Sequence, residues 1–203
     1  MDWNDVSLQQ YAQVYNILIE ENLPDDEKIC LITQELFNIN VLSAPLNEVK
    51  DKINTVKKLL STPIPQNQAL NDVYVLNGKR YKLCSDLSKI TTAQYIDYMN
   101  YINTGVNINT YNIFLSIFFI PEGHEYNDGY SLSELKNNID LYLSIVDATA
   151  ISTFFLHYAK RYRKIFQRYL VQEVMKMKGV KWREKMKIVA EITRVKDGDY
   201  SLY

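Results

Sequence analysis

The 203-residue sequence predicts a mainly α-helical protein, a helical bundle with one β-hairpin and a long basic helix near the C-terminus. Three observations lead to this prediction. Glycine and proline are scarce, at 6 and 5 residues, so helices can continue without interruption. Apolar residues recur at spacings of three and four along most of the chain, which is the period of an amphipathic helix. One Asn-Gly pair, Asn77-Gly78, stands between two runs rich in β-forming residues.

Residues 1–60 predict three helices that form an acidic subdomain. Ser7 and Gln10 have the form of a capping box, so a helix should begin after Ser7. Pro24 precedes three acidic residues, which favour the positive end of a helix dipole. Pro45 begins the third helix. The residues expected on the inner faces are Leu8, Tyr11, Tyr15, Leu18, Ile29, Ile32, Leu36, Phe37, Leu46, Val49, Ile53, Val56 and Leu60.

Residues 61–72 contain two prolines and predict an extended connector to a second domain, residues 73–203. Within residues 73–83, Asn77 and Gly78 predict a hairpin turn, because both central positions of such a turn need a positive φ. Two strands alone are marginally stable in water. The hairpin should therefore pack against helices or against a neighbouring chain.

Further helices are predicted after the hairpin. Thr91 and Gln94 form a second capping box, before a helix expected to bury Ile96, Met99 and Ile102. Residues 111–120 are apolar nearly all round, which predicts one buried helix ending at Pro121. Another helix should begin after a third capping box and carry an inner apolar face. Its capping and inner residues are Ser131, Glu134, Leu135, Ile139, Tyr142, Leu143 and Val146.

The longest predicted element is a basic helix over about residues 148–178, with Asp147 as its N-cap and Gly179 after its end. Its 31 residues would span about 46 Å at 1.5 Å per residue. A last helix is expected over residues 181–195. The long helix carries a heptad-like seam formed by Ile151, Phe155, Tyr158, Tyr162, Ile165 and Tyr169.

Charge is divided sharply along the chain. Residues 1–156 carry 10 Lys and Arg against 19 Asp and Glu, a net charge of −9. Residues 157–203 carry 13 against 5, a net charge of +8. Such an asymmetry indicates a partner, and the long helix interleaves cations with tyrosines. The candidate interface or phosphate-contact residues are Lys160, Arg161, Arg163, Lys164, Arg168, Tyr158, Tyr162 and Tyr169.

Three interpretations of the basic region stay open. It could contact nucleic-acid phosphates from Lys160 to Lys187, independently of sequence and weakened by salt. It could be a solvated face whose long side chains cover the apolar seam. It could also dock on the acidic part of the next copy, a head-to-tail contact that closes into a ring when the rotation permits.

No pattern typical of an enzyme is present. The phosphate-binding loop, the dinucleotide-binding glycine motif and the hydrolase nucleophile elbow are all missing from the sequence. His124 and His157 have no neighbouring ligand set or nucleophile, so we expect neither a metal nor a cofactor. Cys30 and Cys84 predict buried free thiols in a reducing compartment. The polar N-terminus and the lack of a 20-residue apolar run predict a soluble protein without a membrane partner.

Four segments carry a resemblance to known proteins: residues 3–11 (WNDVSLQQY), 74–81 (YVLNGKRY), 90–97 (ITTAQYID) and 119–130 (FIPEGHEYNDGY). Together they resemble small virion-associated proteins of tailed phages that infect Bacteroidetes, including the crAss-like group. The resemblance implies a structural or assembly role near the portal and tail, as a neck ring, an adaptor or a tail-assembly chaperone. It implies no catalytic residues.

These observations lead us to expect a non-enzymatic virion structural protein, a ring-forming head–tail connector or neck component. Complementary charge and Tyr-rich helix faces would join its copies into a homo-oligomer. A portal and packaged DNA would be further partners. The protein would be assembled in the host cytoplasm and located in the virion. The alternatives are a sequence-independent nucleic-acid-binding protein that uses the basic helix, and a tail-assembly chaperone absent from the finished particle.

Overall fold

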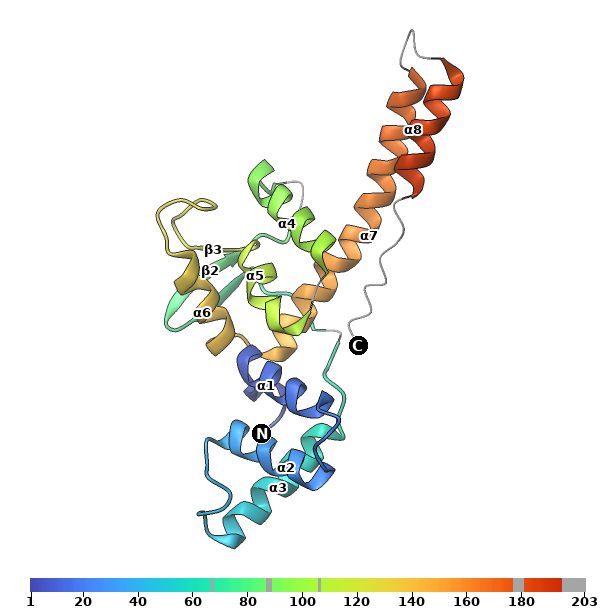
Figure 1. The fold of residues 1–203 in the computed structure, drawn as a ribbon. Helices are drawn as coiled ribbons and strands as arrows, with labels where there is room; N and C mark the ends of the chain where they lie inside the picture. The colour runs from blue at the N-terminus through green and yellow to red at the C-terminus, as the bar shows by residue number, and fades with distance from the viewer. Residues whose placement is uncertain (67, 87–88, 106, 177–180, 195–203) are drawn as a thin grey trace. The chain divides into compact units, whose positions relative to one another are not determined.

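A computed structural model describes residues 1–66, 68–86, 89–105, 107–176 and 181–194, without the side chains of residues 159–170, 172, 173 and 191–194. The predicted mainly α fold is confirmed, and it includes a small antiparallel sheet (Figure 1). The chain divides into two compact units, Met1–Ser152 (unit 1) and Thr153–Tyr203 (unit 2).

Unit 1 begins with the three predicted helices, α1 (Leu8–Ile19), α2 (Asp25–Phe37) and α3 (Leu46–Leu60). The first capping box is confirmed, because the Ser7 hydroxyl accepts a hydrogen bond from the Gln10 N–H and the Gln10 side chain accepts one from the Ser7 N–H. Pro24 and Pro45 directly precede α2 and α3. Short 3-10 helices, η1 (Trp3–Asp5) and η2 (Ile108–Thr110), precede α1 and α5.

The inner faces of these helices agree with the prediction except at the end of α1 and the start of α3. Ile32 and Val56 are fully buried, together with Val14. Leu18 and Leu46, which were expected to lie inside, are 41% and 81% exposed. Both lie in the terminal turn of a helix, where the neighbouring helices no longer cover the apolar face.

The predicted hairpin is confirmed by β1 (Val73–Leu76) and β2 (Lys79–Leu83), with Leu76 opposite Lys79. The turn residues Asn77 and Gly78 have φ angles of 51° and 71°, as a two-residue turn of this kind requires. A third strand, β3 (Phe119–Pro121), pairs antiparallel with β2, so the sheet order is β1-β2-β3.

The prediction of one helix over residues 111–120 is wrong. The helix α5 (Tyr111–Ser116) is short, and the chain then turns into β3. Phe118 and Phe119 are fully buried there, and the Phe118 carbonyl accepts a hydrogen bond from the Cys84 N–H at 2.8 Å. A uniformly apolar run suits a buried strand as well as a buried helix. The open edge of β2 favours the strand, since pairing with it satisfies buried backbone groups.

The helix α4 (Thr92–Thr104) begins with the predicted capping box, and of the three residues expected inside, Ile102 is buried and Met99 is half-buried. Ile96 is 52% exposed, whereas Tyr98 and Tyr101 are buried. The rings of both tyrosines pack on Phe114, with centroid distances of 6.1 and 5.1 Å. The Tyr101 hydroxyl also donates to the Thr110 carbonyl at 2.7 Å, so its burial leaves no unsatisfied hydroxyl.

The helix α6 (Leu132–Tyr142) begins after Ser131, whose hydroxyl accepts a hydrogen bond from the Glu134 N–H. In a full capping box the Glu134 carboxylate would accept a hydrogen bond from the Ser131 N–H. Here it forms an ion pair with Lys79 of β2 instead. The side chain therefore links the helix to the sheet.

The long helix α7 (Ile145–Lys176) begins three residues earlier than predicted. Asp147 is not its N-cap: the Ser144 hydroxyl accepts a hydrogen bond from the Asp147 N–H at 3.0 Å, which places Asp147 in the first turn. The backbone N–H of Leu8 donates to the Leu143 carbonyl at 2.9 Å just before this start. The beginning of the chain thus fixes where α7 begins.

Unit 2 contains the rest of α7 and the helix α8 (Trp182–Arg194). These helices lie side by side (Figure 1), and the Lys185 ammonium of α8 donates to the Met175 carbonyl of α7 at 2.9 Å. In the predicted seam of α7, Phe155 is buried and Tyr158 is half-buried. Ile151 is buried within unit 1, and the side chains of Tyr162, Ile165 and Tyr169 lie outside the described residues.

Candidate functional site

Most of the predicted contact residues belong to the part of α7 whose side chains are outside the described residues. Tyr158 is the exception: it is half-buried, and its ring packs on Phe154 with a centroid distance of 4.8 Å. The role of the others stays a prediction; they are Lys160, Arg161, Arg163, Lys164, Arg168, Tyr162 and Tyr169.

The helix α8 offers a described surface with the same chemistry. Trp182 is 64% exposed and Met186 43% exposed, and they lie one turn apart on this helix. Exposed Lys181 and Arg183 flank Trp182 in the sequence, and Lys187 follows Met186. We call residues 181–187 the basic start of α8. A tryptophan this exposed is unusual, because its large ring is normally mostly buried.

An apolar and acidic counterpart lies on unit 1, where α1 ends and α2 begins. Leu18 and Ile19 are 41% and 56% exposed, and exposed Glu20 and Glu21 follow them. The Lys28 ammonium donates to the Leu18 carbonyl at 2.9 Å and holds α2 against the end of α1. We call this surface the acidic corner. It also contains the carboxylates of Asp25, Asp26 and Glu27 in the first turn of α2.

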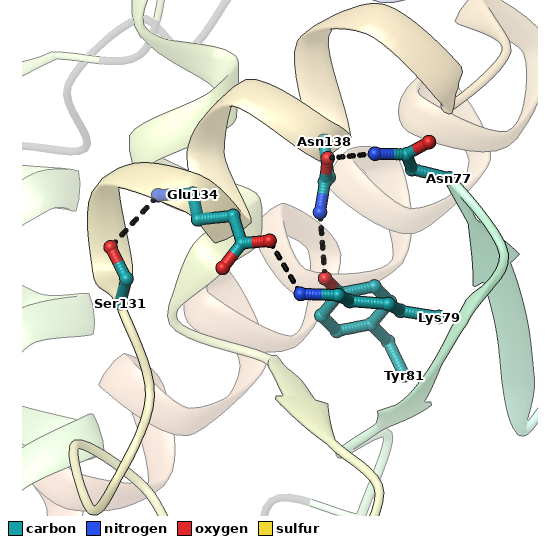
Figure 2. Close-up of polar contacts among 6 residues, drawn as sticks. All are labelled: Asn77, Lys79, Tyr81, Ser131, Glu134 and Asn138. Carbon is teal, nitrogen blue, oxygen red and sulfur yellow. Dashed lines mark hydrogen bonds and ion pairs between the residues drawn. The ribbon is translucent and has the colours of Figure 1, made fainter.

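A polar network joins the sheet to α6 (Figure 2). Asn138 is buried, and its amide donates to the Tyr81 hydroxyl at 2.8 Å while its carbonyl accepts a hydrogen bond from the Asn77 amide at 3.5 Å. Beside it, the hydrogen bond from Lys79 to Glu134 raises the pKa of the lysine. Each group has its partner within the network. We therefore assign these residues to holding the hairpin on α6.

A cleft of about 510 Å³ lies next to this network, between β2, the loop after β3 and the start of α6. Its charged residues include Arg80 and Glu122, which form an ion pair at 2.7 Å. The His124 ring nitrogen Nδ1 lies 3.2 Å from the Asp128 carbonyl oxygen, and the ring packs edge-on against Tyr130. Among the described residues, no group of three or more His, Cys, Asp and Glu side chains could hold a metal ion.

A second cleft, of about 520 Å³, lies beside β3 and is lined by Cys84, Gln94 and Tyr126 among others. Burial raises the pKa of the Cys84 thiol, which disfavours the nucleophilic thiolate at neutral pH. Burial and the nearby Asp97 carboxylate also raise the pKa of Tyr126, whose hydroxyl donates to Asp97 at 2.7 Å. Both Cys84 and Cys30 are free thiols and half-buried, not fully buried as predicted.

Sequence reasoning missed the acidic corner, because it placed Leu18 on an inner face. The available signal was the direct succession of two apolar and two acidic residues, Leu18 to Glu21, where the helix ends. The sequence predicts the helix α8, but the exposure of Trp182 and Met186 depends on how little α7 covers them.

Comparison with protein-family models, with curated proteins and with solved structures finds no match. None of the described helices is both long enough and apolar enough to span a lipid bilayer.

Proposed function

We propose that this chain is a non-enzymatic structural protein of a tailed-phage virion, a ring-forming component of the head–tail connector or neck. The observation that carries the proposal is that the sign of the net charge changes at the boundary between the two units. Residues 153–156 are uncharged, so unit 1 has the net charge of −9 and unit 2 the net charge of +8.

This division suits assembly from identical copies. When two copies meet, the acidic surface of one attracts the basic surface of the other, whereas two acidic or two basic surfaces repel each other. This sets the order of neighbours. A contact between unlike surfaces is head-to-tail, and it produces a ring when the rotation closes. The resemblance to virion-associated phage proteins supplies the setting: assembly in the host cytoplasm, with a portal as neighbour and the virion as final location.

The molar mass in solution tests the proposal. Light scattering at about 0.05 M and 0.5 M salt, without DNA, should give a defined oligomer, or one that forms when the portal protein is added. Raising the salt should weaken it, because exposed charges are screened over about 10 Å at 0.1 M. A monomer under every condition, with and without the portal, would contradict the proposal.

One observation favours a second candidate, sequence-independent nucleic-acid binding. Lys181, Arg183 and Lys187 are exposed on the same short segment as Trp182, and a surface that combines cations with an aromatic ring suits the backbone and bases of a single strand. This function predicts a monomer whose affinity for DNA falls steeply with salt, in proportion to the phosphates contacted. The same light-scattering series with added DNA separates the two candidates.

The tail-assembly chaperone remains the third candidate. It differs from the connector in its final location, since a chaperone leaves before the particle is complete. Mass spectrometry of purified virions should detect the connector in stoichiometric amounts, and its absence from them would favour the chaperone.

A further inference from the structure

We infer that the acidic corner of one copy docks on the basic start of α8 in the next copy. This inference rests on the proposed function, because it names the two surfaces through which the oligomer would form. The central residues would be Leu18 and Ile19 on one side and Trp182 and Met186 on the other.

The exposed apolar side chains are the first step of the argument. Trp182 and Met186 together present a ring and a thioether on one side of α8, and Leu18 and Ile19 present two branched side chains at the end of α1. Apolar side chains of this size gain free energy when they leave water. Tryptophan is also among the residues that most often dominate the energy of an interface.

The net charges of the two surfaces are opposite in sign, although the acidic corner includes Lys28 and the basic start of α8 includes Glu184. Glu20 and Glu21 adjoin Leu18 and Ile19, whereas Lys181 and Arg183 adjoin Trp182. Among the described residues, none of these four charges takes part in an ion pair. An apolar centre with a charged rim is the usual composition of a specific interface, and here the two rims are complementary.

This complementarity selects the occupant. Nucleic acid could neutralise Lys181 and Arg183, but it would leave the exposed Leu18 and Ile19 of the acidic corner without a partner. A second copy provides the opposite charge and an apolar face for both surfaces at once. The contact joins unlike surfaces, as the proposed ring requires.

Charge reversal tests the inference without weakening the helices concerned. In the corner variant, Glu20→Lys and Glu21→Lys place cations at the C-terminal end of α1. In the helix variant, Lys181→Glu and Arg183→Glu place anions at the N-terminal end of α8. Both changes favour the dipole of their own helix, so lost assembly would not reflect lost folding.

We expect each double variant to raise the dissociation constant of the oligomer at least tenfold, measured by light scattering over a dilution series at low salt. The chain with all four substitutions should recover most of the affinity, because its reversed surfaces match again. Trp182→Ala should also raise this dissociation constant at least tenfold. The matched control is Glu125→Lys with Asp128→Lys, which changes the charge of unit 1 equally on an exposed loop and should leave the oligomer intact.

The outcomes separate this inference from the proposed function. If the wild type is oligomeric but the double variants keep its mass, or the fourfold variant fails to recover, the inference is wrong and the connector proposal stands. If the wild type is monomeric with and without the portal, both are wrong. If the acidic corner and the basic start of α8 pair within one chain, the protein is a monomer, and both the inference and the connector proposal are wrong.

Discussion

Unit 1 and unit 2 use the same class of residue in opposite ways. In unit 1 the rings of Tyr98, Phe114 and Phe118 are buried against one another, with centroid distances between 5.4 and 6.1 Å. In unit 2 the ring of Trp182 is 64% exposed, and its sequence neighbours Lys181 and Arg183 are exposed as well. Buried rings gain packing and remove apolar surface from water, whereas an exposed ring can do so only against a partner. The difference separates residues that stabilise the fold from residues available for recognition.

The largest expected effect is in the aromatic cluster of unit 1. Phe118→Ala should lower the free energy of unfolding by about 3–5 kcal/mol, because it removes a fully buried ring and leaves a cavity. Urea denaturation followed by circular dichroism measures this change. Val75→Ala is the control, since Val75 is exposed on β1 and should change stability by less than about 0.5 kcal/mol. A loss below about 1 kcal/mol for Phe118→Ala would contradict the assignment of this cluster as the core.

The next effect concerns the polar network between the sheet and α6. Asn138→Ala should lower the free energy of unfolding by about 1–3 kcal/mol, because the buried Tyr81 hydroxyl loses its hydrogen-bond partner. Adding Tyr81→Phe removes the unsatisfied hydroxyl and should recover part of the loss. A double-mutant cycle in urea measures the coupling between the two residues. Simple additivity of the two single changes would mean that the hydrogen bond contributes nothing.

A smaller effect, with a defined pH dependence, is expected at Asp140. Burial raises the pKa of this carboxyl above its ordinary value of 3.8, although a hydrogen bond from Asn112 partly opposes the shift. The folded chain therefore keeps the proton at a pH where the unfolded chain has released it. Its contribution to stability is complete below the unfolded pKa and is lost as the pH rises through the folded pKa.

Asp140→Asn removes this titration and can keep the hydrogen bond to Asn112. The variant should gain stability relative to the wild type as the pH rises from about 3 to 7, with a gain below about 1 kcal/mol at neutral pH. Thermal unfolding of both proteins across this range measures the difference. A stability difference that is constant with pH, or that changes in the opposite direction, would show that the pKa of Asp140 is not raised in the folded chain.

The smallest effect on stability is expected in unit 2. Trp182→Ala should change the free energy of unfolding by less than about 0.5 kcal/mol, because most of the ring is already exposed to water. The measurement belongs at about 0.5 M salt and low protein concentration, where the chains are dissociated and assembly cannot add stability. A loss of 2 kcal/mol or more would place Trp182 among the core residues and remove the contrast between the units.

Local features of the chain were predictable because they depend on neighbouring residues only. The capping boxes at Ser7 and Thr91 and the hairpin turn at Asn77 are formed by side chains or φ angles within four residues of one another. The prediction failed where a distant segment decided the outcome. Residues 119–121 became a strand because β2 offered an edge, and α4 turned its tyrosines inward because Phe114 and Phe118 were there to receive them.

The amino-acid sequence by itself determined the helical class, the hairpin and the opposite charges of the two parts of the chain, since composition, periodicity and short-range capping are properties of the chain alone. Only the tertiary structure decided which apolar residues stay outside. Leu18 and Trp182 both lie on apolar helix faces, yet both are exposed, because burial depends on whether another element reaches that turn of the helix.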